Sequence, residues 1–300
     1  MKNYLASITS IISITLFLCF KLNAQDGGST ASYLQLGAGA RAIGLGSAFT
    51  GVSDDGSALF WNPAGLSLIK QNIVSGMYSF LQYDRNHDYL SIAHPFNSRY
   101  GTLALNILHY GVANIEGRDL FGEKTENFSD NEIAIDLGYG VFISHDKISI
   151  GFSFRYLYQS LYNNNAHGIA FNMGTLVKIL PFFKFGISAN NIGGYLKWNT
   201  DSGEKENIPL SLRGGIAICP ENIPLLVSAD VEKRQNIDKI FAYAGIEYWL
   251  LKPICLRIGY NQKGFLFGGS IKYDFLQIDY VYSTESELDA VNRIGINLSF

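Results

Sequence analysis

Six residues near the N-terminus combine charge, an aromatic ring and turn-forming types: Arg41, Asp54, Asp55, Trp61, Asn62 and Pro63. A guanidinium beside two carboxylates can form strong ion pairs, and the group could line a gate for a ligand. Asp and Asn also stabilise turns, and Asn can cap a short helix. Because turn chemistry alone explains these residue types, we favour a role in folding and anchoring this segment over a ligand gate.

The glycines in the same segment resemble a cofactor motif. The run from Gly37 to Ala42 fits the spacing of a dinucleotide-binding loop, and two acids follow where a ribose-binding acid would lie. Such a loop opens an alternating series of helices and strands, which this sequence does not show. We therefore reject nucleotide binding and expect no cofactor; small residues and turn signals instead predict a compact plug of turns and short helices over residues 25–71.

We expect no enzymatic activity and no metal site. The five histidines lack the spacing of a zinc motif, and no Gly-x-Ser-x-Gly nucleophile motif occurs. His109 projects from an apolar strand face, where an interfacial histidine is the simpler interpretation. Cys219 and Cys255 are interpreted as small apolar residues, with a disulfide between them as the alternative.

From residue 72 onward, the chain repeats segments of about ten residues with an apolar side chain at every second position, the period of a β-strand. Between Ile133 and Val141 the odd positions are large and apolar, and the even positions are small or polar. About fourteen such segments lie near residues 72–83, 88–96, 99–110, 131–143, 147–160, 167–179, 182–191, 208–218, 224–234, 239–250, 253–262, 264–274, 276–284 and 290–300. This strand content exceeds the 20–25% of ordinary domains, and a membrane barrel accounts for it.

The connections between these segments favour a barrel over a soluble sandwich. Very short turns alternate with generally longer polar loops, the arrangement of outer-membrane barrels. A sandwich would carry Lys and Glu on its exposed face, whereas the non-apolar face here is mostly Gly, Ser, Asn and Ala. We predict an all-β fold: an antiparallel transmembrane β-barrel of about 14 strands over residues 72–300, in contact with outer-membrane lipid.

Charged residues of both signs fall on the face predicted to point into the barrel, and seven of them are candidate lumen residues: Asp136, Arg155, Lys184, Arg213, Glu247, Arg257 and Lys272. They could form a polar path for a solute or a structural network of ion pairs around the plug. We favour the network, because charges in a small lumen need partners.

The two ends of the chain carry export and assembly signals. Lys2, the apolar run from residue 8 to 20 and the closing Ala24 predict a signal peptide over residues 1–24. The last strand, with Arg293, Gly295, Leu298 and the terminal Phe300, resembles the signature read by the barrel-assembly machinery. The formal charge of −3 disfavours a nucleic-acid partner, and charged residues make up only 16% of the chain, against about 25% in soluble domains.

The run from Leu36 to Leu66 resembles the opening of PorV/PorQ family proteins, barrels similar to the FadL fatty-acid transporters. The resemblance rests on Gly39-Ala40-Arg41-Ala42, Gly44-Leu45-Gly46, Asp54-Asp55 and Trp61-Asn62-Pro63-Ala64. It implies a barrel in the outer membrane of a Gram-negative bacterium with the N-terminal segment inside it as a hatch. It also implies an accessory role in type IX secretion, binding secretion-system subunits or exported proteins. The alternative is a FadL-like channel for uptake or export of small hydrophobic compounds.

Overall fold

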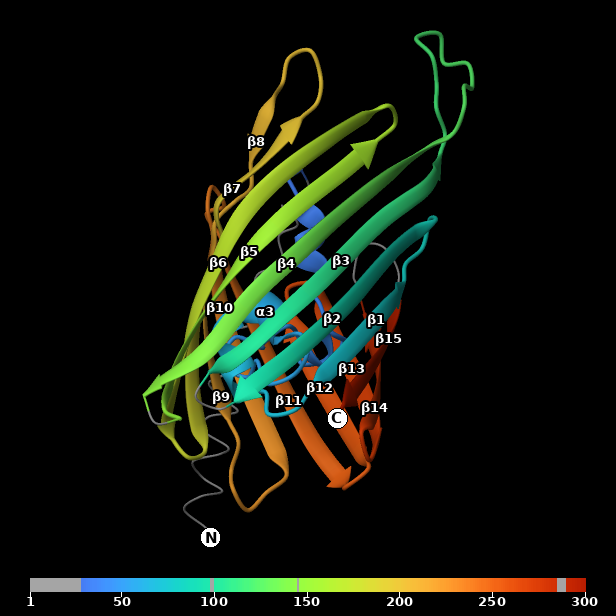
Figure 1. The fold of residues 1–300 in the computed structure, drawn as a ribbon. Coiled ribbons are helices and arrows are strands. Elements are labelled where there is room, and N and C mark those ends of the chain that lie inside the picture. The colour runs from blue at the N-terminus through green and yellow to red at the C-terminus, as the bar shows by residue number, and fades with distance from the viewer. Residues whose placement is uncertain (1–27, 98–99, 145, 285–289) are drawn as a thin grey trace.

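The computed structural model describes residues 28–97, 100–144, 146–284 and 290–300, which form one closed antiparallel barrel (Figure 1). Of the fifteen strands described, all but the three-residue β8 (Lys205–Asn207) form the wall. Wall strands that follow one another in the chain are neighbours, and β1 pairs with β15 to close the cylinder. The predicted fold class of about 14 antiparallel strands is confirmed.

The wall strands lie close to the predicted segments. They are β1 (Ile73–Phe80), β2 (Arg85–Asn97), β3 (Gly101–Ile115), β4 (Phe128–Ser144), β5 (Ile148–Leu161), β6 (Asn164–Leu180), β7 (Phe183–Trp198), β9 (Ser211–Ile218), β10 (Leu225–Arg234), β11 (Ile240–Leu251), β12 (Ile254–Asn261), β13 (Gly264–Tyr273), β14 (Leu276–Ser283) and β15 (Val291–Ser299). The largest differences are the ends of β3 and β7, which continue into stretches predicted as loops. Ladder hydrogen bonds continue there although the apolar alternation has stopped.

The wall is taller on one side than on the other. Strands β3 to β7 have 14 to 17 residues, whereas β9 to β15 have 8 to 12. A tilted strand needs about 9–11 residues to cross a bilayer. The extra length of β3 to β7 therefore rises beyond the shorter strands, and Figure 1 shows this side extending above the rest of the barrel, with β8 at the same end.

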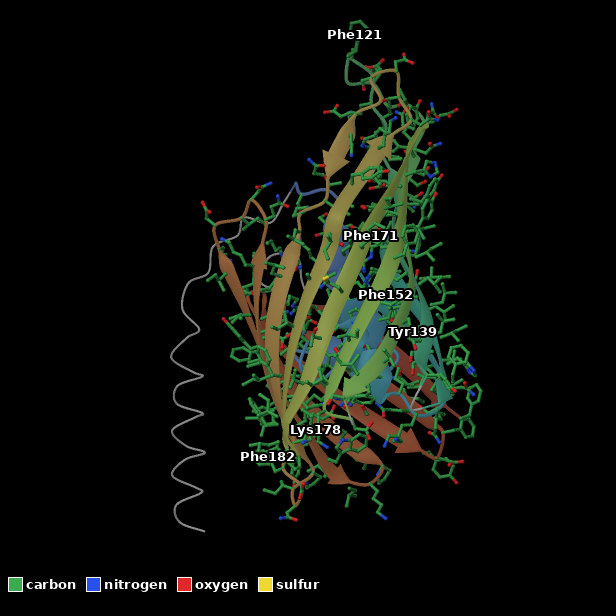
Figure 2. The ribbon with its side chains drawn as sticks, turned by 60° about the vertical axis from the view of Figure 1, so that its left-hand side comes forward. Phe121, Tyr139, Phe152, Phe171, Lys178 and Phe182 are labelled. Carbon is green, nitrogen blue, oxygen red and sulfur yellow. The ribbon has the colours of Figure 1, made fainter. Side chains whose placement is uncertain are left out.

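The outside of the barrel is apolar. On β5 and β6, Phe152, Phe154 and Phe171 point outward and are exposed, and Figure 2 shows Phe152 and Phe171 on the outer face near mid-height. Their neighbours on the same strands, such as Ser153 and Asn172, point inward and are buried. Soluble proteins rarely expose apolar surface on this scale, whereas a bilayer requires it.

The N-terminal segment fills the inside of the barrel with four short helical turns (Figure 1). They are η1 (Ser32–Leu36), α2 (Ala40–Gly44), α3 (Ala58–Trp61) and η2 (Pro63–Leu68). Residues 28–72 are called the hatch below. Along the described chain, no helix has the length and apolar character needed to span a membrane.

The last strand completes the cylinder. β15 pairs with β1 and β14, the Arg293 side chain is buried inside, and Leu298 is half-buried. Phe300 is exposed, and its backbone exchanges hydrogen bonds with Asn72. An assembly role for this strand stays a prediction, and the predicted signal peptide, residues 1–24, lies outside the described residues. Cys219 and Cys255 are both free thiols, so the disulfide alternative is wrong for this structure.

Candidate functional site

Glycines in the wall let the hatch backbone approach the strands closely. A Cβ on Gly151 of β5 would lie 2.3 Å from the backbone oxygen of Pro63, and one on Gly259 of β12 would lie 2.1 Å from the nitrogen of Gly46. Gly46 itself has φ +67°, a conformation that favours glycine. Larger residues at these wall positions would push the hatch inward, so the small inner face of the barrel is part of the hatch site.

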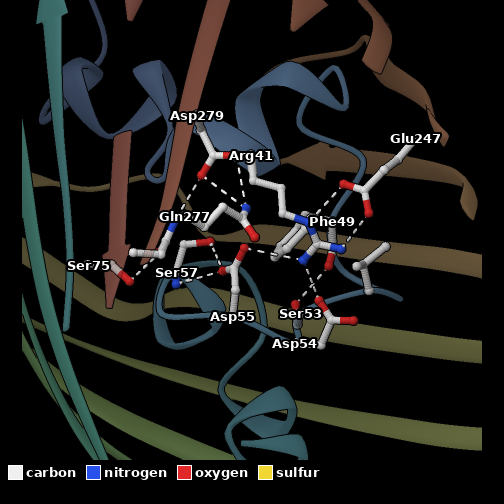
Figure 3. A network of polar contacts seen from close by, with 12 residues as sticks. Arg41, Phe49, Ser53, Asp54, Asp55, Ser57, Ser75, Glu247, Gln277 and Asp279 are labelled. Carbon is white, nitrogen blue, oxygen red and sulfur yellow. Dashed lines mark hydrogen bonds and ion pairs between the residues drawn. The ribbon is translucent and has the colours of Figure 1, made fainter. Parts of the chain in front are cut away.

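Arg41 connects the hatch to the wall (Figure 3). Its Nε and Nη2 donate to the two oxygens of Glu247 on β11, at 2.9 and 3.0 Å, which is a bidentate pair. Its Nη1 donates to Asp54 at 2.6 Å and to Asp55 at 3.4 Å within the hatch. Three predicted hatch residues therefore form one cluster with a predicted lumen residue; we call these four residues the latch.

The two hatch carboxyls of the latch differ in their ionisation. Burial opposes the charge on Asp54, but Arg41 and Lys184 outweigh burial and hold the pKa of Asp54 below its ordinary value. Burial raises the pKa of Asp55 above its ordinary value, and Arg41 offsets this only in part. The hydrogen bonds that Asp55 accepts from the backbone N–H and hydroxyl of Ser57 show that this carboxyl also shapes the turn.

Trp61, Asn62 and Pro63 hold the hatch in shape. The indole N–H of Trp61 donates to the backbone oxygen of Ala38 at 2.8 Å. The Asn62 side chain caps η2 by accepting from the N–H of Ala64, and it donates to the backbone of Thr50 and to Thr175 on β6. Pro63 occupies the first turn of η2, where its missing N–H costs nothing.

Most of the predicted lumen charges are buried and paired. Arg155 makes a bidentate pair with Asp136, at 2.7 and 3.0 Å. Arg257 donates to Glu247 at 2.6 Å and to Asp279 at 2.9 Å. Three predicted lumen residues remain. Arg213 contacts Asp230, and Lys184 donates to the backbone oxygen of Val52. Lys272 is exposed near the end of β13. Lys272 therefore does not join the buried network, because its strand ends one residue later.

A cavity of about 130 Å³ lies between the hatch and the wall. Its apolar lining includes Leu34, Leu36, Ile43, Phe60, Trp61, Phe241 and Leu266; its polar lining includes Asn190, Asn191, Ser211, Arg213, Glu232, Arg234 and Tyr243. Ser211 begins β9 and Arg234 ends β10, which places the cavity toward the end of the barrel that carries β8. One side of the cavity is therefore apolar and the other is polar.

Arg213 is one of the residues on the polar side of the cavity. Its guanidinium carbon lies 4.9 Å from the centre of the Trp61 ring and 4.4 Å from that of Tyr243. Its Nη2 donates to the backbone oxygen of Ser47 at 2.8 Å and lies 3.6 Å from Asp230. The hatch and the wall therefore fix this guanidinium together, with its charge balanced by a carboxylate and by two aromatic faces.

The wall beside the cavity is irregular. The pairing of β6 with β7 shifts register on both sides of Phe171, and Asn191 and Gly193 have positive φ angles. A bulge of this kind turns side chains out of the regular alternation. Asn190 stays in register with Ser211 of β9 and faces inward, and the bulge turns Asn191 inward beside it, so both line the cavity. Neither residue was predicted from the sequence. The sequence does indicate the bulge, because the alternation of apolar and polar residues stops at Asn190-Asn191-Ile192-Gly193-Gly194.

Comparison with solved structures identifies the fold. The chain resembles the CymD monoaromatic hydrocarbon channel (TM-score 0.64, 14% identity, covering 88% of this chain and 98% of CymD). It also resembles the toluene transporter TodX of Pseudomonas putida (0.62, 15%, 88% and 97%) and a FadL homologue of Pseudomonas aeruginosa (0.55, 11%, 85% and 94%). The barrel has the fold of these proteins.

No family model and no curated protein matches the chain. Membership of the PorV/PorQ family therefore stays a prediction that rests on residues 36–66. The structural likeness extends over the whole barrel, but at 11–15% identity it establishes the fold and not the ligand.

Proposed function

We propose that this chain is an outer-membrane channel for small hydrophobic compounds, and that the cavity between hatch and wall is its binding site. The observation that carries the proposal is the cavity itself, which has Phe60, Trp61 and Leu36 on its hatch side. Because the hatch and the wall form the site together, a movement of the hatch changes the shape of the site. Ligand binding is therefore coupled to opening of the channel.

The size of the cavity limits the ligand. An apolar protein cavity of about 150 Å³ holds one benzene molecule, and this cavity measures about 130 Å³. A single ring or a short branched chain fits within this volume. The names of CymD and TodX give monoaromatic hydrocarbons and toluene as the compounds that those channels take. Cavity size and fold therefore favour the same class of compound.

Uptake by intact cells tests the proposal. Cells that place the chain in the outer membrane should take up labelled toluene faster than cells carrying an empty vector. Leu36→Trp should abolish the gain, because the indole fills the cavity. Leu68→Trp is the matched control: Leu68 is another half-buried hatch leucine, outside the cavity lining, and this variant should keep the gain. Equal uptake by expressing and control cells would contradict the proposal.

The secretion role is the second candidate, and one surface feature favours it besides the motif in residues 36–66. The loop between β3 and β4 projects from the tall side of the barrel with Phe121 at its tip (Figure 2), and Leu120 and Phe121 are both almost fully exposed. Exposed apolar groups of this kind occur at protein-binding surfaces. Native pull-down with the tagged chain should then recover secretion-system subunits or exported proteins, and Phe121→Ser should reduce the recovery. An empty pull-down counts against this role.

A further inference from the structure

Two lysines lie opposite each other on the outer face of the barrel at its tall end. Lys197 on β7 and Lys205 on β8 are direct partners in the antiparallel pairing of these strands, and both side chains are exposed. Directly opposite side chains have Cβ atoms about 4.5–5.5 Å apart, so two like charges there repel each other. Among the residues that the structure describes, neither ammonium group forms an ion pair or donates a hydrogen bond. The pair is therefore a local positive charge that no carboxylate of the described chain balances.

The outer face around this lysine pair carries no acid. From β4 to β9, none of the outward-facing residues of the described strands is Asp or Glu. Glu206 on β8 points inward, where its carboxylate accepts from the indole N–H of Trp198 at 2.8 Å and from the hydroxyl of Thr30 in the hatch at 2.9 Å. Asp201 and Glu204, in the turn between β7 and β8, form no ion pair with either lysine in the described part of the chain. The balancing charge must therefore come from outside the protein.

Aromatic rings connect the lysine pair to the apolar belt. The Nζ atom of Lys205 lies 4.0 Å from the centre of the Tyr195 ring, which stabilises the ammonium group at this position. His167 on β6 is the direct partner of Lys197, and its ring lies 5.2 Å from that of Tyr158 on β5. Rings of this kind gather where the hydrocarbon core of a membrane meets the headgroups.

The height of the lysine pair places it at the headgroups of the outer leaflet. Ile169 is the last outward apolar residue of β6, and His167, level with the lysines, follows two residues later, about 7 Å along the strand. The two longest connections between wall strands, residues 116–127 and 199–210, lie at this end, whereas the opposite end has short turns such as 181–182 (Figure 1). In outer-membrane barrels the longer loops face the outside of the cell.

We propose that Lys197 and Lys205 bind a phosphate group of the phosphorylated glycolipid that forms the outer leaflet of a Gram-negative outer membrane. The phosphate lies between the two ammonium groups, and its oxygens accept hydrogen bonds from both, so that attraction to one anion replaces the repulsion between two cations. The acyl chains of the lipid lie along the outward apolar residues of β6, which include Ile169 and Phe171. The proposal requires a barrel in the outer membrane and does not depend on the channel function.

Native mass spectrometry of the folded chain in detergent tests the proposal. The probes are lipid A with two phosphates, which is the membrane-anchored part of the glycolipid, the same lipid with both phosphates removed, and phosphatidylglycerol. We expect the phosphorylated lipid A to bind at least about tenfold more tightly than the form without phosphates, since each lysine adds to the attraction for an anionic lipid. Equal binding of these two lipids would overturn the proposal. Equally tight binding of phosphatidylglycerol would overturn the assignment to the outer-leaflet lipid.

A pair of double variants locates the site. Lys197→Gln combined with Lys205→Gln should bring the affinities for the two forms of lipid A within about threefold of each other. Lys147→Gln combined with Lys178→Gln is the matched control, because these two lysines are also exposed and adjacent, the N–H of Lys178 donating to the backbone oxygen of Lys147 at 2.7 Å, but lie at the opposite end of the barrel (Figure 2). The control should keep the preference for the phosphorylated form. Equal loss of the preference in both double variants would overturn the proposal.

The melting temperature without lipid provides a second test. Because the two lysines repel each other and contact no acid, Lys197→Gln should leave the melting temperature of the lipid-free chain unchanged or raise it. Added phosphorylated lipid A should raise the melting temperature of the unaltered chain more than that of the Lys197→Gln, Lys205→Gln double variant. A lower melting temperature of Lys197→Gln without lipid would show that the lysine is paired within the protein, which would contradict the proposal.

Discussion

Arg41 carries more connections between hatch and wall than its neighbours in the hatch. Its guanidinium makes a two-bond pair with Glu247, and a third nitrogen contacts both Asp54 and Asp55. The fork geometry matters here, because an ammonium group cannot make the paired bonds. Glu247 also holds Arg257, so the latch continues into the buried charges of the wall.

Removal of the Arg41 side chain should weaken the latch. Arg41→Met leaves the nearly buried Glu247 with one partner fewer, and we expect a loss of about 3 kcal/mol in the free energy of unfolding. Arg41→Lys should retain part of the stability that Arg41→Met loses. Denaturant titration in lipid vesicles measures the loss, with Lys178→Met, an exposed cation at the end of β6, as the control that should show no loss. A stable Arg41→Met variant would mean that the latch does not hold the hatch.

Asp54 and Asp55 should respond to neutralisation in opposite directions. The pKa of Asp54 is lowered by folding, so its charge stabilises the fold above the unfolded pKa of about 3.9 and this stabilisation is lost as the pH falls. The pKa of Asp55 is raised, so its charge costs stability at neutral pH, and the cost disappears as the pH falls. At pH 7, Asp54→Asn should therefore lower the melting temperature, and Asp55→Asn should leave it unchanged or raise it. The same sign for both variants would contradict this assignment.

Some of the site residues are visible in the sequence and others are not. Arg41, Asp54 and Trp61 stand out because charge and aromatic rings are rare in a segment of small residues. Asn191 and Tyr243 do not stand out, since their place on the cavity depends on the bulge in β7 and on the pairing of β10 with β11. Register of that kind is set by tertiary packing and turn geometry, and alternation alone does not give it.

Among the structural elements, the fit of η2 against the wall depends on glycine. A Cβ on Gly151 would meet the Pro63 backbone at 2.2 Å and the Ala64 nitrogen at 2.5 Å. These atoms belong to the main chain of the hatch and cannot rotate away. The contact therefore requires a wall residue without a side chain.

Gly151→Ala should displace η2. We expect a loss of about 1–3 kcal/mol from overpacking, together with faster cleavage of the hatch in limited proteolysis. Gly214→Ala is the matched control, because a Cβ on this β9 glycine meets no atom within 4 Å. It should be neutral or slightly stabilising. Equal behaviour of the two variants would show that the hatch does not depend on this contact.

The strands themselves were predictable because each has one lipid-facing side and one inward side. A two-residue period with apolar residues on one face specifies a membrane strand, and nearly every segment was placed within a few residues. The upper parts of β3 and β7 lie beyond the apolar alternation, which is why they read as loops. The three residues of β8 are too few to show any period.

The whole molecule is a cylinder of tilted strands. Its outside is apolar, its inside carries paired charged side chains, and the hatch lies inside it between the two ends. The predicted lumen charges contribute to the buried network, with Lys272 as the exception. The apolar belt on the outside includes Phe152, Phe154 and Phe171, and the rings of Phe154 and Phe171 pack edge to face at 5.6 Å.

Charge placed on this belt should be penalised according to depth. Phe152→Arg, near mid-height in Figure 2, should cost about 2–4 kcal/mol of unfolding free energy in vesicles. Phe182→Arg, at the turn that precedes β7, should cost at most about 1 kcal/mol because the guanidinium reaches the interface. A similar cost at both positions would mean that the exposed apolar face does not contact a hydrocarbon core.

Crystals of the barrel soaked with bromobenzene show whether the cavity binds a single aromatic ring, because the bromine can be located by its anomalous scattering. We predict one ordered bromine in the cavity between Trp61 and the inner face of β7 and β9 in the unaltered chain, and none there in Leu36→Trp. Ordered bromobenzene only on the outer surface of the barrel, with the cavity unchanged, would mean that the cavity is not the binding site of a channel.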